Sequence, residues 1–256
     1  GGAAISLSNE KTTTDIYLTG VVTDDNSCQD IHASTTADIW LTSVGHTACN
    51  QTGEADNNDC YPRVSCSYDA AVEECTGATD KTGGYKCTIS FQYYANPTDA
   101  NTAWSTDSWT GSLVPADGQG VNEGGAGDSA ITTMNSFLAL SLESGYDAIA
   151  YGNISAGIHT TTLEEKTRVE AAGNVSLDVS LSGTSMTGPG ADITADNQKY
   201  AATGVAWASG TDPSGSPAPF DLNTCTSGYT GTPEYKPVYW GINIPAGQVS
   251  GAYTGT

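Results

Sequence analysis

Residues 85–93 read Tyr-Lys-Cys-Thr-Ile-Ser-Phe-Gln-Tyr, and apolar side chains alternate with polar ones along the whole stretch. Strict alternation is typical of a β-strand with one buried face, because successive side chains of a strand point to opposite sides. Asn96-Pro97 ends the pattern, since proline cannot donate a hydrogen bond to a sheet. This stretch therefore predicts β-structure.

Similar signals recur along the chain. We expect further strands at residues 15–22, 39–41, 137–142, 148–151, 175–181 and 238–244. Residues 161–172 lack a repeating apolar face, so they are interpreted as an exposed strand with a charged side rather than a helix. Residues 45–82 are rich in turns and cysteines and are expected to form a stapled loop region rather than sheet. Many short strands between Gly and Pro turns predict an all-β protein made of β-sandwiches.

Composition excludes several classes of protein. The chain has 256 residues, of which 38% are hydrophobic, 30 are Gly, 29 are Asp or Glu and 8 are Lys or Arg. The formal net charge of −21 disfavours nucleic acid and anionic membrane surfaces as partners. No run approaches the ~18 apolar residues that a bilayer-spanning helix needs, so we expect no membrane insertion. The acidity fits either solubility outside the cell or cation binding.

The clearest boundary is a stretch dominated by Gly, Asp and Asn. It predicts a disulfide-rich β-sandwich domain at residues 1–116, a linker at 117–130 and a second β-sandwich domain at 131–256. The chain opens Gly1-Gly2-Ala3-Ala4 without Met, which fits a secreted protein after removal of its signal peptide and also an expression scar.

Six of the seven cysteines lie before the linker, at Cys28, Cys49, Cys60, Cys66, Cys75 and Cys87. An even, clustered set predicts a disulfide framework and an oxidising, extracellular or cell-surface location. A zinc site would need paired C-x-x-C cysteines or nearby histidines at fixed spacing, and neither is present. Fifteen connectivities stay open. The seventh cysteine, Cys225, is expected to be a free thiol, with a bond to another chain as the alternative.

The sequence contains no pattern typical of an enzyme. The three histidines, His32, His46 and His159, are not accompanied by a Gly-x-Ser-x-Gly nucleophile turn, and we expect them on the surface or in loops. No phosphate-binding glycine loop or His-Glu-x-x-His motif occurs. Acidic pairs for glycoside hydrolysis are plentiful in so acidic a chain, but no pair stands out.

Calcium is the candidate cofactor, because it prefers carboxylate and amide oxygens on loops. The candidate ligands lie in three groups: Asp24, Asp25 and Asp30; Asp56, Asn58 and Asp59; and Asp99. Asp and Asn also occur at turns simply to bond the local backbone, which is the alternative for each group. Three sites fit the pattern for N-glycosylation, at Asn50, Asn153 and Asn174.

Two stretches carry a resemblance to known proteins. Residues 93–99 (Tyr-Tyr-Ala-Asn-Pro-Thr-Asp) follow a cysteine-bearing strand, and residues 238–247 and 250–256 form a strand, a Pro-x-Gly turn and a Gly-x-Tyr-Thr-Gly element. The second stretch resembles the closing hairpin of secreted immunoglobulin-like domains. Together, both halves resemble two-domain surface proteins of uncultured small-genome bacteria and archaea. The resemblance implies two immunoglobulin-like β-sandwich domains and an exported, non-enzymatic protein. In such domains a further apolar strand usually follows, whereas this sequence stops at Thr256.

The leading hypothesis is an extracellular structural protein, a filament or surface-layer subunit that binds copies of itself. A sandwich lacking one strand exposes an edge that can accept a strand from another chain. The candidate donor alternates apolar and polar side chains over Ala3, Ala4, Ile5, Ser6 and Leu7. The alternative is that these residues form an ordinary first strand of their own domain.

The sequence is also compatible with two other classes of function. A monomeric adhesin or carbohydrate-binding module would use exposed aromatic side chains, for which Trp104, Trp109, Tyr93 and Tyr94 are the candidates. A secreted hydrolase would need a cleft with two close carboxylates.

Overall fold

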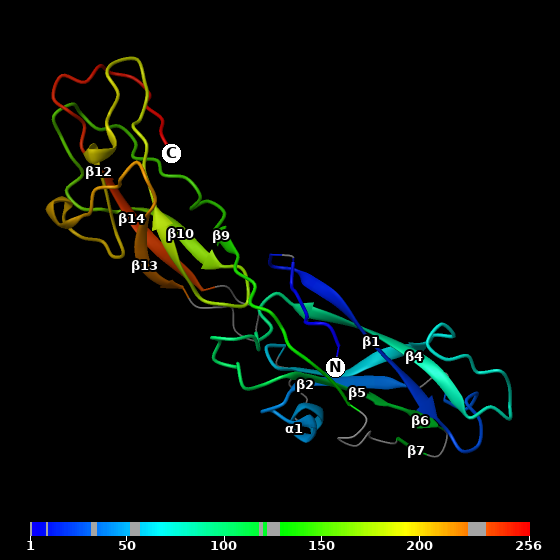
Figure 1. Ribbon diagram of the computed structural model, residues 1–256. Helices are drawn as coiled ribbons and strands as arrows, with labels where there is room; N and C mark the ends of the chain where they lie inside the picture. Colours follow the sequence, from blue (N-terminus) through cyan, green and yellow to red (C-terminus); the bar gives the residue numbers. More distant parts are fainter. Residues whose placement is uncertain are drawn as a thin grey trace. The chain divides into compact units, whose positions relative to one another are not determined.

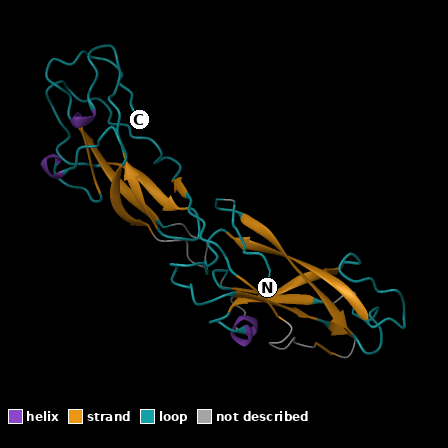
Figure 2. Cartoon of the chain, viewed as in Figure 1, coloured by secondary structure: helices purple, strands orange, loops and turns teal. Residues whose placement is uncertain are grey.

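The computed structural model describes residues 2–8, 10–31, 35–51, 57–117, 120–121, 129–224 and 234–256, and their secondary structure is almost entirely β (Figure 2). Every pair of named strands is antiparallel. The chain divides into two compact units: the described residues of unit 1 fall within 2–138 and 172–175, and the rest belong to unit 2. The all-β prediction is confirmed.

Unit 1 is built on one six-stranded sheet in the order β1-β4-β3-β2-β5-β8 (Figure 1). Its strands are β1 (Thr13–Thr23), β2 (Thr36–Leu41), β3 (Cys60–Tyr68), β4 (Thr82–Gln92), β5 (Trp109–Val114) and β8 (Ser129–Thr132). The short helix α1 (His46–Gln51) and the pair β6 (Ala116–Asp117) and β7 (Gly120–Val121) complete the unit. The residues expected to form the linker thus begin in β6 and end in β8, and the chain passes to unit 2 after Leu138.

The alternating stretch at residues 85–93 falls almost entirely within β4, as predicted, and Cys87, Ile89 and Phe91 point into the core. Aromatic rings fill the centre of this core: Phe91 lies 4.8 Å from Tyr61 and 4.9 Å from Trp109, measured between ring centroids. The Trp109 indole N–H donates to the Asn96 carbonyl at 2.9 Å, so its polar atom keeps a partner inside the core.

The six clustered cysteines form three disulfides: Cys28–Cys75, Cys49–Cys60 and Cys66–Cys87. The second joins α1 to β3, and the third joins the neighbouring strands β3 and β4. Such a framework indicates an oxidising environment, because disulfides persist there and are rare in reducing compartments. Cys225 lies outside the described residues.

The prediction of a loop region at residues 45–82 was wrong at β3, which lies inside the sheet between β4 and β2. The physical reason is a local irregularity. Arg63 has a φ of 55°, next to Pro62, and the pairing with β2 shifts register between Ala37 and Ile39. A bulge of this kind breaks the alternation by which a strand is recognised in sequence.

Unit 2 contains two sheets, one in the order β12-β14-β10-β9 and one that pairs β11 with β13 (Figure 1). Its elements are β9 (Leu140–Leu142), β10 (Glu165–Ala171), β11 (Leu177–Leu181), β12 (Gln198–Ala201), β13 (Ala218–Thr224), β14 (Tyr235–Ile242) and two 3-10 turns, η1 (Ala195–Asn197) and η2 (Trp207–Ser209). Both sheets contribute to one buried cluster, which includes Val169, Val179 and Val238. The two sheets of unit 2 therefore pack against each other.

Three expectations for unit 2 need correction. Residues 161–172 do contain a strand, β10, but it lies between β14 and β9, and its Glu170 is buried rather than exposed. Residues 148–151 form no strand, although Ile149 and Tyr151 pack against the core of the unit. Only the last three residues of 137–142 form a strand. Long loops make up much of this unit (Figure 2), and some of their apolar side chains, such as those of Ile149 and Tyr151, pack against the core.

In the described part of the chain, none of the helices combines the length and the apolar character that crossing a membrane requires.

Candidate functional site

The two outer strands of the unit 1 sheet, β1 and β8, flank an apolar groove of about 400 Å³. Ile16 and Leu18 line it from β1, and Ile131 lines it from β8. Core side chains form its floor: Ile39, Ile89, Phe91 and Trp109. The open edge of the sheet therefore gives direct access to the hydrophobic core of the unit.

Two contacts, each between a glycine of one strand and a leucine of the other, hold β1 close to β5. A Cβ atom at Gly20 would lie 2.8 Å from Leu113 Cδ1, and one at Gly111 would lie 3.1 Å from Leu18 Cδ2. Each leucine therefore fills space that a side chain on the opposite strand would need. The sheet curls so that β1 contacts β5, although β1 and β8 do not pair with each other.

A leading segment, Gly2–Leu7, lies along the outer edge of β8 and the residues that follow it. Ile5 bonds to both neighbours of Met134: its N–H donates to the Thr133 carbonyl, and its carbonyl accepts from the Asn135 N–H, each at 2.8 Å. The Gly2 N–H donates to the Ile131 carbonyl at 3.3 Å. This pairing is parallel.

The side chains of the leading segment alternate between core and solvent. Ile5 and Leu7 are each 6% exposed and belong to the core cluster of unit 1, whereas Ala3, Ala4 and Ser6 are exposed. The sequence alternatives for these residues were a donor to another chain and a first strand of their own domain. Within one chain the structure shows the second arrangement, and exchange between chains stays a prediction.

The leading segment covers only part of the open edge. Ile131 is 51% exposed, and Ile16 and Leu18 are only half-buried although they face inward from β1. A second hollow of about 430 Å³ lies between residues 18–23 of β1 and a wall that includes Leu113 and Ala130, and it shares Leu18, Gly111 and Ala130 with the first. An extended chain that pairs with the edges of the sheet would pass along these hollows.

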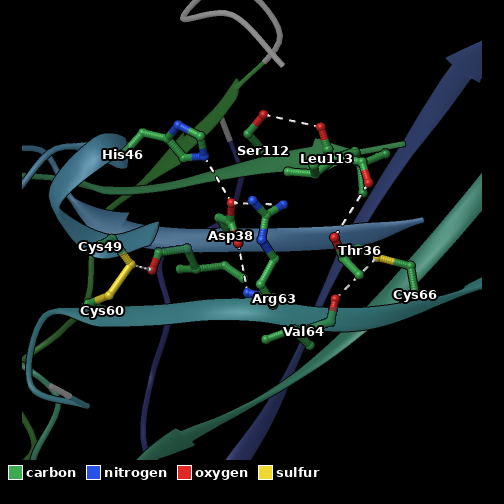
Figure 3. Close-up of polar contacts among 12 residues, drawn as sticks. Thr36, Asp38, His46, Cys49, Cys60, Arg63, Val64, Cys66, Ser112 and Leu113 are labelled. Carbon is green, nitrogen blue, oxygen red and sulfur yellow. Dashed lines mark hydrogen bonds and ion pairs between the residues drawn. A yellow bond between two sulfur atoms is a disulfide. The ribbon is translucent and has the colours of Figure 1, made fainter. Parts of the chain in front are cut away.

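Apart from the apolar groove, unit 1 contains a polar cluster around Asp38, which is fully buried (Figure 3). Its Oδ1 accepts from the Arg63 backbone N–H at 2.7 Å, and its Oδ2 lies 2.9 Å from His46 Nε2. The hydroxyl of Ser112, on the neighbouring strand, donates to the Leu113 carbonyl (Figure 3). Asp38 thereby joins α1, β2 and the bulge in β3, which is a structural role.

Two of the acidic candidates for calcium accept hydrogen bonds within the protein. Asp24 Oδ1 accepts from the N–H groups of Asn26 and Ser27 at 2.6 and 3.1 Å, and both Asp99 oxygens accept from Ser136 at 2.8 Å. The remaining described candidates are Asp25, Asp30, Asn58 and Asp59, while Asp56 lies outside the described residues. Within the described ranges, no group of three or more His, Cys, Asp or Glu side chains is arranged to hold a metal ion. Turn formation accounts for Asp24, whereas Asp99 ties its loop to Ser136, 37 residues further along the chain.

The expectation of exposed aromatic side chains was wrong. Trp109 is 1% exposed, Tyr93 and Tyr94 are buried, and Trp104 packs partly buried against the core. The Trp109 ring packs in the core of unit 1 beside aliphatic side chains such as Ile39, Leu41 and Ile89. The site expected for a carbohydrate-binding module is therefore absent at these four residues.

The glycosylation candidates differ in accessibility. Asn174 is buried: its Oδ1 accepts from the Phe137 N–H at 2.6 Å and its Nδ2 donates to the Asn135 carbonyl at 3.2 Å. It holds residues 135–137 in place and is not accessible in the folded protein. Asn153 is exposed. The Asn50 side chain and His32 lie outside the described residues, and His159 stacks on Trp207 with ring centroids 5.4 Å apart.

No family model, curated protein or solved structure matches this chain.

Proposed function

We propose that the chain is an extracellular structural protein, a subunit of a homopolymeric filament or surface layer that assembles by exchange of β-strands. The observation that supports this most strongly is the open edge of unit 1. Two outer strands flank an apolar groove, and a short segment of period-two sequence, residues 2–6, forms part of its wall. Such an edge favours pairing with a strand from another chain.

Three disulfides and a strongly acidic surface fit a protein that works outside the cell. Disulfides stabilise small cores mainly by restricting the unfolded chain, at ~2–4 kcal/mol each. A net charge of −21 keeps free subunits soluble through mutual repulsion, so assembly requires a specific contact such as strand pairing.

We further propose that both units are immunoglobulin-like sandwiches and that the likeness to two-domain surface proteins reflects a shared role. The packed sheets of unit 2 and its Pro245–Gly247 turn after β14 support this assignment. In unit 1, the contact of β1 with β5 within its single curled sheet supports the same assignment.

The test is the size of the purified chain in solution as its concentration is raised. A filament or layer subunit should sediment as species much larger than its 26.3 kDa chain mass, and negative-stain micrographs should show regular polymers. A homogeneous 26.3 kDa monomer at every concentration and ionic strength would refute the proposed function.

A further inference from the structure

We propose that the groove between β1 and β8 is the acceptor site for the Gly2–Leu7 segment of a second copy of this chain, which replaces the chain's own segment in the same register. The inference rests on the proposed function and specifies its contact: which residues are donated, which receive them and in which direction the strands run.

In the chain itself this segment forms one wall of the groove, which residues 2–6 line, so the place that a donated segment would take is already shaped for it. Ile5 and Leu7 are buried among core residues that include Met134, and the backbone of Ile5 bonds on both sides of Met134. The segment runs parallel to β8 and then turns back into β1, so it lies antiparallel to β1. An identical segment from another copy makes identical contacts, because domain exchange replaces like with like.

The connection between the leading segment and β1 favours exchange. Only residues 8–12 separate the two, and the Ser8 N–H lies 3.5 Å from Thr14 Oγ1. Lys11 has a φ of 55°, which is unfavourable for a residue with a side chain. Short hinges under strain promote domain swapping, since an extended hinge removes the strain while all other contacts are regained in the neighbour.

The composition of the segment also suits insertion. Gly2, Ala3 and Ala4 expose little apolar surface when the segment is withdrawn, and only Ile5 and Leu7 then need a new core. Because each copy has one segment and one groove, the contact is heterologous. It extends into an open polymer unless the geometry closes it into a ring.

Engineered cysteines distinguish exchange from the arrangement within one chain. A Cβ at Gly2 would lie 3.9 Å from Thr132 Cβ, which is within the ~3.5–4.5 Å range of disulfides. We would prepare Gly2→Cys and Thr132→Cys as separate proteins in a Cys225→Ser background, concentrate them together, oxidise them and measure chain mass without reduction. The matched control replaces Thr132→Cys with Thr88→Cys, at an exposed threonine of β4 that lines neither hollow.

Exchange predicts that the Gly2→Cys and Thr132→Cys mixture doubles in covalent mass, while the control mixture does not. The double variant Gly2→Cys/Thr132→Cys, oxidised under the same conditions, should form a covalent ladder.

If the protein forms large assemblies but the double variant forms its engineered disulfide only within each chain, this acceptor site is wrong and the proposed function stands. A lack of both assemblies and interchain bonds would overturn both.

Discussion

Units 1 and 2 are both antiparallel β-structures, yet they are stabilised in different ways. Unit 1 has three disulfides and an aromatic core, whereas unit 2 has two packed sheets and no disulfide among its described residues. The disulfide Cys66–Cys87 joins β3 to β4, which lie inside the sheet, whereas the outer strands β1 and β8 contain no cysteine. Covalent links inside a small sheet are therefore compatible with outer strands that can pair with other segments.

The largest difference in stability between the two units is expected when the disulfides are reduced. Each bridge contributes ~2–4 kcal/mol, and all three lie in unit 1. We expect a reductant to abolish the unit 1 unfolding transition at moderate temperature and to leave that of unit 2 in place, as followed by calorimetry. If the reductant lowered the melting temperatures of both units equally, the disulfides would not stabilise unit 1 selectively.

Truncation of Leu7 tests whether the leading segment belongs to the core of unit 1. Leu7→Ala should destabilise unit 1 by about 2–4 kcal/mol, because a buried leucine is lost and a cavity is left. Chemical denaturation measures this change, and Ala4→Ser, at an exposed position of the same segment, is the matched control. Equal effects of the two changes would show that the segment contributes no specific packing.

The close approach of β1 to β5 can be tested with a double-mutant cycle. Gly20→Val should destabilise unit 1 by about 1–3 kcal/mol, since its Cβ would meet Leu113 Cδ1 at 2.8 Å. Leu113→Ala opens that space, so the double variant should lose less stability than the sum of the single changes. Strict additivity in urea denaturation would mean that the two strands do not meet there.

A smaller effect is expected from acid. Hydrogen bonds from the backbone and hydroxyls of Thr76 and Thr82 lower the pKa of Asp80 from 3.8 to about 2. A lowered pKa in the folded state stabilises unit 1 above the unfolded pKa, and this contribution is lost as the pH falls from near 4 toward 2. Asp80→Asn should flatten the pH dependence of the unit 1 melting temperature in that window, whereas Asp25→Asn, at an exposed carboxylate, should not. Identical pH profiles for wild type and Asp80→Asn would contradict this role.

Local pattern was sufficient to predict much of the fold. Alternation identified β4, β1 and β14, because each strand has one face in the core. It failed at β3, where Pro62 and the positive φ of Arg63 interrupt the pattern, and at residues 148–151, which reach the core from a loop. At β3 and at residues 148–151, contacts with segments far away in the chain determine the structure, and local strand propensity does not report them.

The candidate site was only partly visible in the sequence. The alternation of Ile5 and Leu7 marked the leading segment, but its partner strand β8 lies more than a hundred residues away. The mutual fit of Gly20 with Leu113 is likewise a property of the folded chain. The burial of Trp109, Tyr93 and Tyr94 could not be predicted, because an aromatic side chain in a sequence can belong either to a core or to a ligand-binding surface.

The concentration dependence of melting tests strand exchange in unit 1 most directly. If the leading segment is donated between copies, the melting temperature of unit 1 should rise with protein concentration, because a partner that binds only the folded state stabilises it by mass action. The melting temperature of unit 2 should stay constant in the same calorimetric scans. Equal, concentration-independent melting of both units would contradict the account.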